Sequence, residues 1–121
     1  MSSPAKAHDI QARALEFAVR AVKLCQYMDA KPGVARTLSR QLLRSATSIG
    51  ANLEEAQAGH SKRDFICKVE IALKEARETS YWLRLVVAAG IVSVTRISAL
   101  RVEAEELAKI LGSITVSAKR T

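Results

Sequence analysis

Four stretches of the chain place hydrophobic residues at alternating steps of three and four positions, which is the spacing of one face of an α-helix. They cover about residues 8–29, 34–58, 61–89 and 94–116. In the second stretch the repeating positions are Leu42, Ala46, Ile49, Leu53 and Ala56. Short connections make consecutive helices antiparallel neighbours. The pattern therefore predicts an all-α fold in which residues 1–121 form one up-down-up-down four-helix bundle.

The connections carry residues that end or begin helices. Lys31-Pro32-Gly33 ends the first helix, because proline interrupts the hydrogen-bond ladder and glycine accepts a positive φ. Ser61 followed by Asp64 is a variant of the capping box that begins the third helix. Residues 1–7 are expected to form a loose arm and residues 117–121 a fraying tail. Gly50, inside the second helix, costs about 1 kcal/mol relative to alanine, a cost that is tolerable if another backbone packs closely there.

The third stretch has hydrophobic residues on two sides. Its expected core face comprises Phe65, Val69, Ala72, Leu73, Ala76, Ser80, Leu83 and Val87. The far side carries a second row, which comprises Cys67, Ile71, Tyr81 and Leu85, with Trp82 nearby. Stacking of bases on the two aromatic rings is one interpretation, but their apolar neighbours favour packing at an interface. Helix 3 is therefore predicted to bury both faces.

Beside its core positions, the second helix has a row of mostly small polar residues, which comprises Gln41, Ser45, Ser48, Asn52 and Glu55. Small side chains let a neighbouring helix approach closely, and an amide or hydroxyl group there can fix its register. The alternative is a half-exposed helix flank. The polar row of the second helix and the far side of the third helix together predict a homo-oligomer interface. It comprises Ser48, Asn52, Glu55, Cys67, Ile71, Tyr81, Trp82 and Leu85.

Positive charge gathers in part of the chain. The net charge is +7, and residues 31–63 hold six basic residues against two acids, while the tail adds Lys119 and Arg120. On a helical wheel Arg36, Arg40 and Arg44 lie opposite the core without acids four residues later, so they repel one another. A solvated face is one interpretation, and an anionic partner is the other. The nucleic-acid-binding residues predicted on the second interpretation are Arg36, Arg40, Arg44, Lys62 and Arg63.

The sequence offers little for catalysis. His8 and His60 are the only histidines, no glutamate has a histidine three residues later, and the glycines match no phosphate-binding loop. Cys25 and Cys67 lack CxxC spacing and an activating base. We therefore expect that the protein is not an enzyme and that it has no catalytic residues, metal or cofactor. With no run of 18 apolar residues and no signal peptide, the chain is expected to be cytoplasmic and without a membrane partner.

Residues 44–86 resemble the four helix bundle protein family, also described as the 23S rRNA intervening-sequence proteins. The resemblance is carried by Ser48-Ile49, Asn52, Glu55, Lys62, Asp64-Phe65, Ile71-Ala72 and Glu75. Many members continue Asn-Ile-Ala-Glu-Gly, whereas here Asn52 is followed by Leu53-Glu54-Glu55-Ala56, which we interpret as a subfamily difference. The resemblance implies a ring-like homopentamer of up-down bundles. It also implies a relation to the accessory variability proteins of diversity-generating retroelements, basic pentamers thought to bind nucleic acid and a reverse transcriptase.

Two functional hypotheses follow. The first is a non-enzymatic homo-oligomeric bundle that binds RNA or other nucleic acid through a basic surface. The alternative is a protein-interaction scaffold with an unknown protein partner and no nucleic-acid role. Intervening-sequence members have no established biochemical activity, so the resemblance does not choose between them. Salt dependence does, because affinity for phosphates falls steeply with ionic strength.

Overall fold

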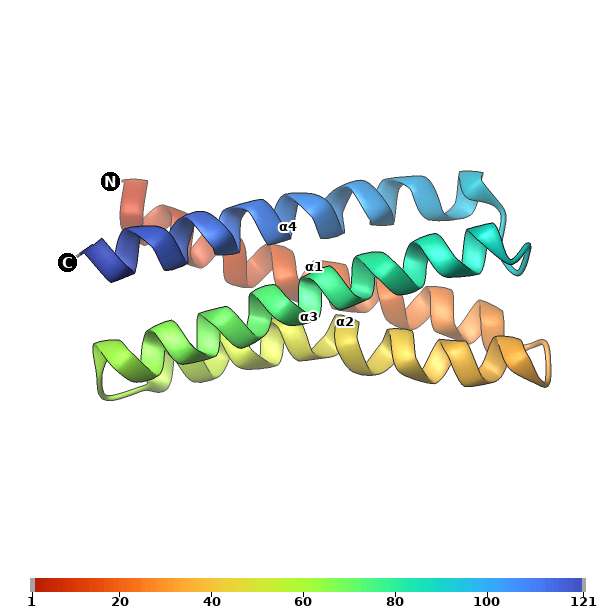
Figure 1. The fold of residues 1–121 in the computed structure, drawn as a ribbon, viewed down its shortest axis with the longest axis horizontal. Coiled ribbons are helices and arrows are strands. Elements are labelled where there is room, and N and C mark those ends of the chain that lie inside the picture. Colours follow the sequence, from red (N-terminus) through yellow and green to blue (C-terminus); the bar gives the residue numbers. More distant parts are fainter. Residues whose placement is uncertain (1, 121) are drawn as a thin grey trace.

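The structure is a computed structural model that describes residues 2–120, with side chains described from residue 10 onward. It contains α1 (Ser2–Asp29), α2 (Val34–Ala58), α3 (Lys62–Ala88) and α4 (Val94–Arg120). Figure 1 shows the four helices running antiparallel in turn, with the α1–α2 and α3–α4 turns at one end and the two termini beside the α2–α3 turn at the other. The predicted all-α four-helix bundle is confirmed.

The outer helices are longer than the sequence pattern predicted. α1 begins at Ser2 instead of residue 8, and α4 continues to Arg120 instead of ending at residue 116. Proline is tolerated in the first turn of a helix, so Pro4 does not prevent the early start. At the other end, the Lys119 ammonium lies 2.6 Å from the Glu70 carboxylate of α3, which holds the last turn against the bundle. Of the expected arm and tail, Met1 and Thr121 lie outside the described residues.

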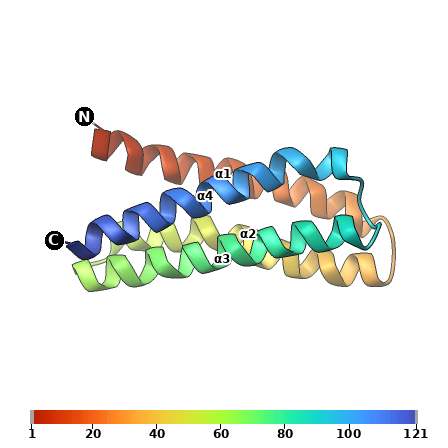
Figure 2. The same cartoon turned by 45° about the horizontal axis from the view of Figure 1, so that its top comes forward.

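Each helix packs against two neighbours, in the order α1, α2, α3, α4 around the bundle, and no Cα atom of a described helix residue lies within 8 Å of one on the diagonally opposite helix. α1 and α4 form the loosest of the four adjacent pairs. Figure 2 shows why, since α1 diverges from α4 toward the N-terminus. These two helices are the first and the last of the chain, and no connection holds them together.

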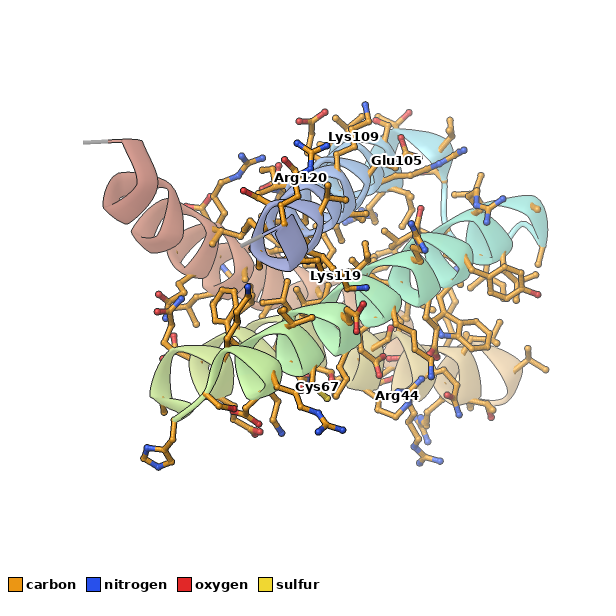
Figure 3. All side chains as sticks on the ribbon, turned by 60° about the vertical axis from the view of Figure 1, so that its left-hand side comes forward. Arg44, Cys67, Glu105, Lys109, Lys119 and Arg120 are labelled. Atoms are coloured by element: carbon orange, nitrogen blue, oxygen red, sulfur yellow. The ribbon has the colours of Figure 1, made fainter. Side chains whose placement is uncertain are left out.

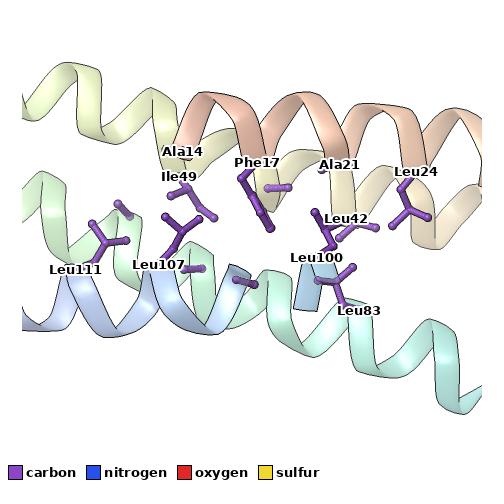
Figure 4. Close-up of a cluster of buried hydrophobic side chains, with 14 of the residues drawn as sticks. Ala14, Phe17, Ala21, Leu24, Leu42, Ile49, Leu83, Leu100, Leu107 and Leu111 are labelled. Carbon is purple, nitrogen blue, oxygen red and sulfur yellow. The ribbon is translucent and has the colours of Figure 1, made fainter. Parts of the chain in front are cut away.

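The hydrophobic stripes read from the sequence form the core (Figure 4). All five α2 positions are buried, as are the α1 positions Ile10, Ala14, Phe17, Ala21, Leu24 and Met28. In α3 the expected face is displaced, because Thr79 and Val86 are fully buried while Ser80 and Val87 are half-buried. α3 packs against α2 on one side and α4 on the other, and the α2 contact draws the buried arc toward Thr79.

Local contacts at the predicted connections agree with the sequence. Gly33 has φ 93° and Gly90 has φ 75°, a region that glycine adopts without strain. The Ser61 hydroxyl accepts a hydrogen bond of 3.0 Å from the Asp64 backbone N–H, which confirms the helix cap. A Cβ built on Gly50 would lie 3.6 Å from the Ala14 Cβ, so the expected close approach of another helix is confirmed, and that helix is α1.

Candidate nucleic-acid interface

The three arginines of the predicted α2 row differ in the groups that they contact. The Arg36 guanidinium donates a 3.1 Å hydrogen bond to the Asp29 backbone carbonyl across the turn, and Arg40 is exposed. Arg44 pairs with Glu78 and lies 3.3 Å from the Glu75 carboxylate, both on α3. The prediction that this row lacks compensating acids is therefore wrong for Arg44, because the acids come from the neighbouring helix. Figure 3 shows Arg44 extending from α2 beside α3.

Lys62 and Arg63 lie at the start of α3, at the end of the bundle opposite Arg36. The 14 residue steps of α2 from Arg44 to Ala58 span about 20 Å at 1.5 Å per residue. Lys62 and Arg63 are both exposed and border a shallow depression on α3 together with Cys67. The structure thus does not bring the five predicted basic residues into one patch.

Positive charge instead collects where the α1–α2 and α3–α4 turns meet. We call residues 20–42 and 80–102, which contain these turns and the adjoining helix ends, the basic end. Its lysines and arginines are Arg20, Lys23, Lys31, Arg36, Arg40, Arg84, Arg96 and Arg101, and its only acid is Asp29. Eight bases against one acid give +7, and the remaining 11 bases and 11 acids of the chain cancel. The whole net charge of the protein therefore resides at one end of the bundle.

A groove between α1 and α4 lies within the basic end. α1 contributes Arg20, Lys23 and Tyr27 to its wall, and α4 contributes Arg96. The floor is made by Leu24 and Leu100, which are buried, and the groove encloses about 210 Å³. The Arg96 guanidinium carbon lies 3.8 Å from the centroid of the Tyr27 ring, so the two side chains stack. No acidic side chain lines the groove.

The structure brings the predicted oligomer residues to one side of the bundle, along α2 and α3. Within the chain, their polar members already have partners. The Asn52 amide donates to the Ser48 carbonyl at 2.9 Å, and the Lys68 ammonium lies 2.8 Å from the Glu55 carboxylate. Ser45, from the same polar row, is buried against α3, where its hydroxyl lies 2.8 Å from that of Thr79. The polar row thus fixes the register of α2 on α3.

The apolar members of the same prediction remain partly open to solvent. Tyr81 is 49% exposed and Cys67 is exposed, while Ile71, Trp82 and Leu85 are half-buried. The Trp82 indole N–H donates to the Glu78 carboxylate at 2.9 Å, and its ring meets that of Tyr81 edge-on at 5.2 Å between centroids. These rings pack with each other and with acidic and apolar neighbours of their own chain.

A second exposed apolar strip was missed by sequence reasoning. It comprises Leu15, Val19 and Val22 on α1 with Leu43 on α2, and Leu15 is 67% exposed. The α1 members step by four and three, the same spacing as the core row. A second hydrophobic row was considered only for the third helix, so this signal in the first helix was not used. The strip and the α3 residues Cys67, Ile71, Tyr81 and Leu85 lie on different sides of the bundle.

Two features of the described residues bear on possible chemistry, their potential metal ligands and their two cysteines. No group of three or more His, Cys, Asp or Glu side chains among them is arranged to hold a metal ion. Cys25 and Cys67 are both free thiols. Burial raises the pKa of the Cys25 thiol, a hydrogen bond with Ser39 opposes this shift, and Asp29 adds to it. Within residues 2–120, no helix combines the length and the hydrophobicity needed to cross a membrane.

The fold and charge distribution define an antiparallel four-helix bundle with one basic end. A family model for the 23S rRNA-intervening sequence protein matches residues 6–113, so the chain belongs to that family and the resemblance noted in its sequence is confirmed. The crystal structure of a protein of unknown function from the S23 ribosomal protein family of Bacteroides thetaiotaomicron VPI-5482 is similar, with a TM-score of 0.81 and 42% identity. That match covers 88% of this chain and 97% of the other. A comparison with curated protein sequences finds no match.

Proposed function

We propose that this protein is a non-enzymatic, homo-oligomeric bundle that binds RNA, or another nucleic acid, through its basic end. The observation that carries the proposal is the location of the net charge, since eight lysines and arginines face one acid there while the rest of the chain is neutral. Phosphate contacts dominate the affinity of proteins for nucleic acids. This concentrated and mostly exposed set of cations can supply such contacts, and the one described ion pair within it, between Arg101 and Glu105 at 3.6 Å, lies along a single helix.

The pairing of the basic residues narrows the expected contacts. Arg36 and Arg40 belong to the basic end and are exposed, so they remain in the proposed interface. Arg44 is held by Glu75 and Glu78, and its charge is compensated before any ligand arrives. We therefore transfer the proposed contact surface from the complete α2 row to the two turns of the basic end.

Self-association is supported by two apolar surfaces that lie on different sides of the bundle. Contacts between unlike surfaces of neighbouring subunits generate rings when the rotation closes, whereas twofold dimers use the same surface twice. The α1–α2 strip at Leu15 and Val19 and the α3 surface at Ile71 and Tyr81 supply such an unlike pair. A ring would repeat the basic end around its axis, and family resemblance implies that the ring is a pentamer.

The nucleic-acid proposal is tested by fluorescence polarisation with a labelled structured RNA at 50 and 200 mM KCl. The double variant Arg36→Ala/Arg40→Ala should bind several-fold more weakly and show a smaller salt slope, because each lost phosphate contact lowers that slope by about one. Lys62→Ala/Arg63→Ala removes the same charge from the opposite end and should bind like wild type. Equal losses in both variants, or no saturable binding of wild type at 50 mM KCl, would contradict the proposal.

Arg44→Ala separates this proposal from the row predicted by sequence. Because Arg44 is occupied by two carboxylates, its removal should leave RNA affinity unchanged while slightly lowering the free energy of unfolding. A loss of affinity as large as that of Arg40→Ala would restore the complete α2 row as the contact surface. Circular dichroism and light scattering confirm in each case that the fold and assembly survive.

The exposed apolar strip supports the alternative, a protein-interaction scaffold. That function predicts no saturable RNA binding at any salt concentration and a partner protein that covers Leu15 and its neighbours.

Self-association is tested by light scattering at micromolar concentration, where Leu15→Glu and Ile71→Glu should each shift the mass toward the monomer. Val102→Glu, at an exposed position of α4, is the matched control and should leave the mass unchanged. A monomeric wild-type protein would refute self-association.

A further inference from the structure

The seam between α1 and α4 presents two successive levels that differ in charge. At the first level, the Arg13 guanidinium of α1 pairs with the Glu103 carboxylate of α4 through two hydrogen bonds, of 2.8 and 3.0 Å. Seven residues further along α1 stands Arg20, and seven residues earlier on α4 stands Arg96. Because seven residues are close to two helical turns, these two side chains return to the same seam and both line the groove. An arginine therefore occupies the α4 position that holds an acid at the other level.

Among the residues whose side chains the structure describes, the cations of this groove have no anionic partner. Lys23, three residues after Arg20, adds a third positive charge to the same wall. Arg20, Lys23 and Arg96 form no ion pair with any residue between 10 and 120. Three positive charges therefore line the groove, whereas Arg13 and Glu103 form an ion pair at the other level of the same helix contact. The groove thus has the positive electrostatic potential of an anion-binding site.

Arg96 is held in a defined orientation. Its guanidinium stacks on the Tyr27 ring at 3.8 Å, and its backbone N–H lies 3.4 Å from the Ser93 hydroxyl that it bonds at the start of α4. Stacking on an aromatic face leaves the N–H groups at the edge of a guanidinium available to oxygen acceptors, and their planar fork matches a phosphate. The ring thus orients Arg96 without neutralising it.

The size of the groove limits its ligand. Its volume of about 210 Å³ is below the roughly 300–1,000 Å³ of sites that enclose drug-sized molecules. The groove is open to solvent on one side, where Lys23 and Tyr27 are exposed. These dimensions suit a single tetrahedral anion whose substituents extend outward, and they do not suit an enclosed base and sugar.

We propose that the α1–α4 groove is a phosphate-binding site in which Arg20, Lys23 and the Tyr27-stacked Arg96 hold one phosphate group. Resting on the proposed function, this site engages a backbone phosphate of the bound RNA and sets the position of the strand at the basic end. A free phosphate compound offers the same chemistry, and the experiment distinguishes the two sources.

The protein of 121 residues is titrated with pyrophosphate at constant ionic strength, and binding is measured from the nuclear magnetic resonance chemical shifts of the groove residues. A second titration uses labelled RNA. Arg96→Gln and Arg20→Glu should lower both affinities at least tenfold. Arg40→Gln, which removes one charge of the basic end outside the groove, should leave pyrophosphate affinity unchanged. Arg20→Glu should in addition raise the melting temperature, because it places an acid opposite Arg96 as Glu103 stands opposite Arg13.

The outcomes separate the site from the proposed function. Saturable pyrophosphate binding that depends on Arg96, without RNA binding, supports the groove as a site for a free phosphate compound and refutes nucleic-acid binding. RNA binding that depends on Arg40 but is unchanged in Arg96→Gln and Arg20→Glu refutes the groove and leaves the proposed function intact. Wild-type protein that shows no saturable pyrophosphate binding also overturns the site.

Discussion

The close approach of α1 and α2 at Gly50 lets us predict how much a side chain added at this position changes the stability of the protein. A methyl group at this position would lie 3.6 Å from the Ala14 Cβ and 3.7 Å from the Ala14 carbonyl carbon, which are ordinary van der Waals separations. Gly50→Ala therefore adds a methyl group without a clash and removes the helix-propensity cost of glycine, about 1 kcal/mol. We expect the free energy of unfolding to rise by about 1 kcal/mol. For a domain of 121 residues that corresponds to a melting temperature about 4 °C higher.

Gly112 in α4 supplies a matched control, because nothing lies within 4 Å of a Cβ built there. Gly112→Ala gains helix propensity alone. Substitution by valine distinguishes positions 50 and 112 further. The added carbons of Gly50→Val would meet the Ala14 backbone, and this overpacking should lower the free energy of unfolding by about 1–3 kcal/mol. Gly112→Val should carry no such penalty. Urea unfolding followed by circular dichroism measures all four variants, at one protein concentration because self-association shifts apparent stability.

Two results would refute this reasoning. If Gly50→Ala lowers the free energy of unfolding while Gly112→Ala raises it, α1 and α2 lie closer together than the structure places them. If Gly50→Val is as stable as Gly112→Val, the helices do not meet at Ala14, and the glycine has no packing role.

Three further predictions concern single contacts. Ser45→Ala and Thr79→Val remove the two halves of a buried 2.8 Å hydroxyl contact, so a double-mutant cycle should give a coupling energy of about 1 kcal/mol, and zero coupling would show that the contact contributes nothing. Cys67 should react rapidly with a thiol reagent at pH 8, whereas buried Cys25, with its raised pKa, should react only as the protein unfolds; equal rates would contradict its burial. Ser61→Ala removes a helix cap and should cost about 1 kcal/mol, while exposed Ser98→Ala should cost nothing measurable.

Local periodicity was sufficient to predict the core because a bundle helix buries the stripe that its own sequence defines. The α2 row from Leu42 to Ala56 is buried throughout. α3 is the exception, because a polar contact with α2 helps decide which of its side chains are buried. There the hydroxyl of Thr79 finds partners in Ser45 and in the Glu75 carbonyl of its own helix, so a polar residue becomes fully buried where a hydrophobic pattern predicts Ser80.

The charge distribution was only partly readable from the sequence. Windows of consecutive residues separate 20–42 from 80–102, although an up-down topology already places these two segments at one end. Combining them would have revealed the basic end. The acids that pair with Arg44 depend on the register of α2 against α3, which shows in cross-helix contacts such as that of Ser45 with Thr79. The pairing of Arg13 with Glu103 and the placement of Arg20 opposite Arg96 depend on two helices that no turn connects.

The ion pairs of the bundle argue that its basic end is not an adaptation for stability. The described ion pairs between helices involve Arg13, Arg44, Lys68 and Lys119, and all four lie outside the basic end. Within the basic end, no described lysine or arginine pairs with an acid of another helix. Eight cations that repel one another act against the compact state. Their placement therefore supports the proposed ligand that carries negative charge.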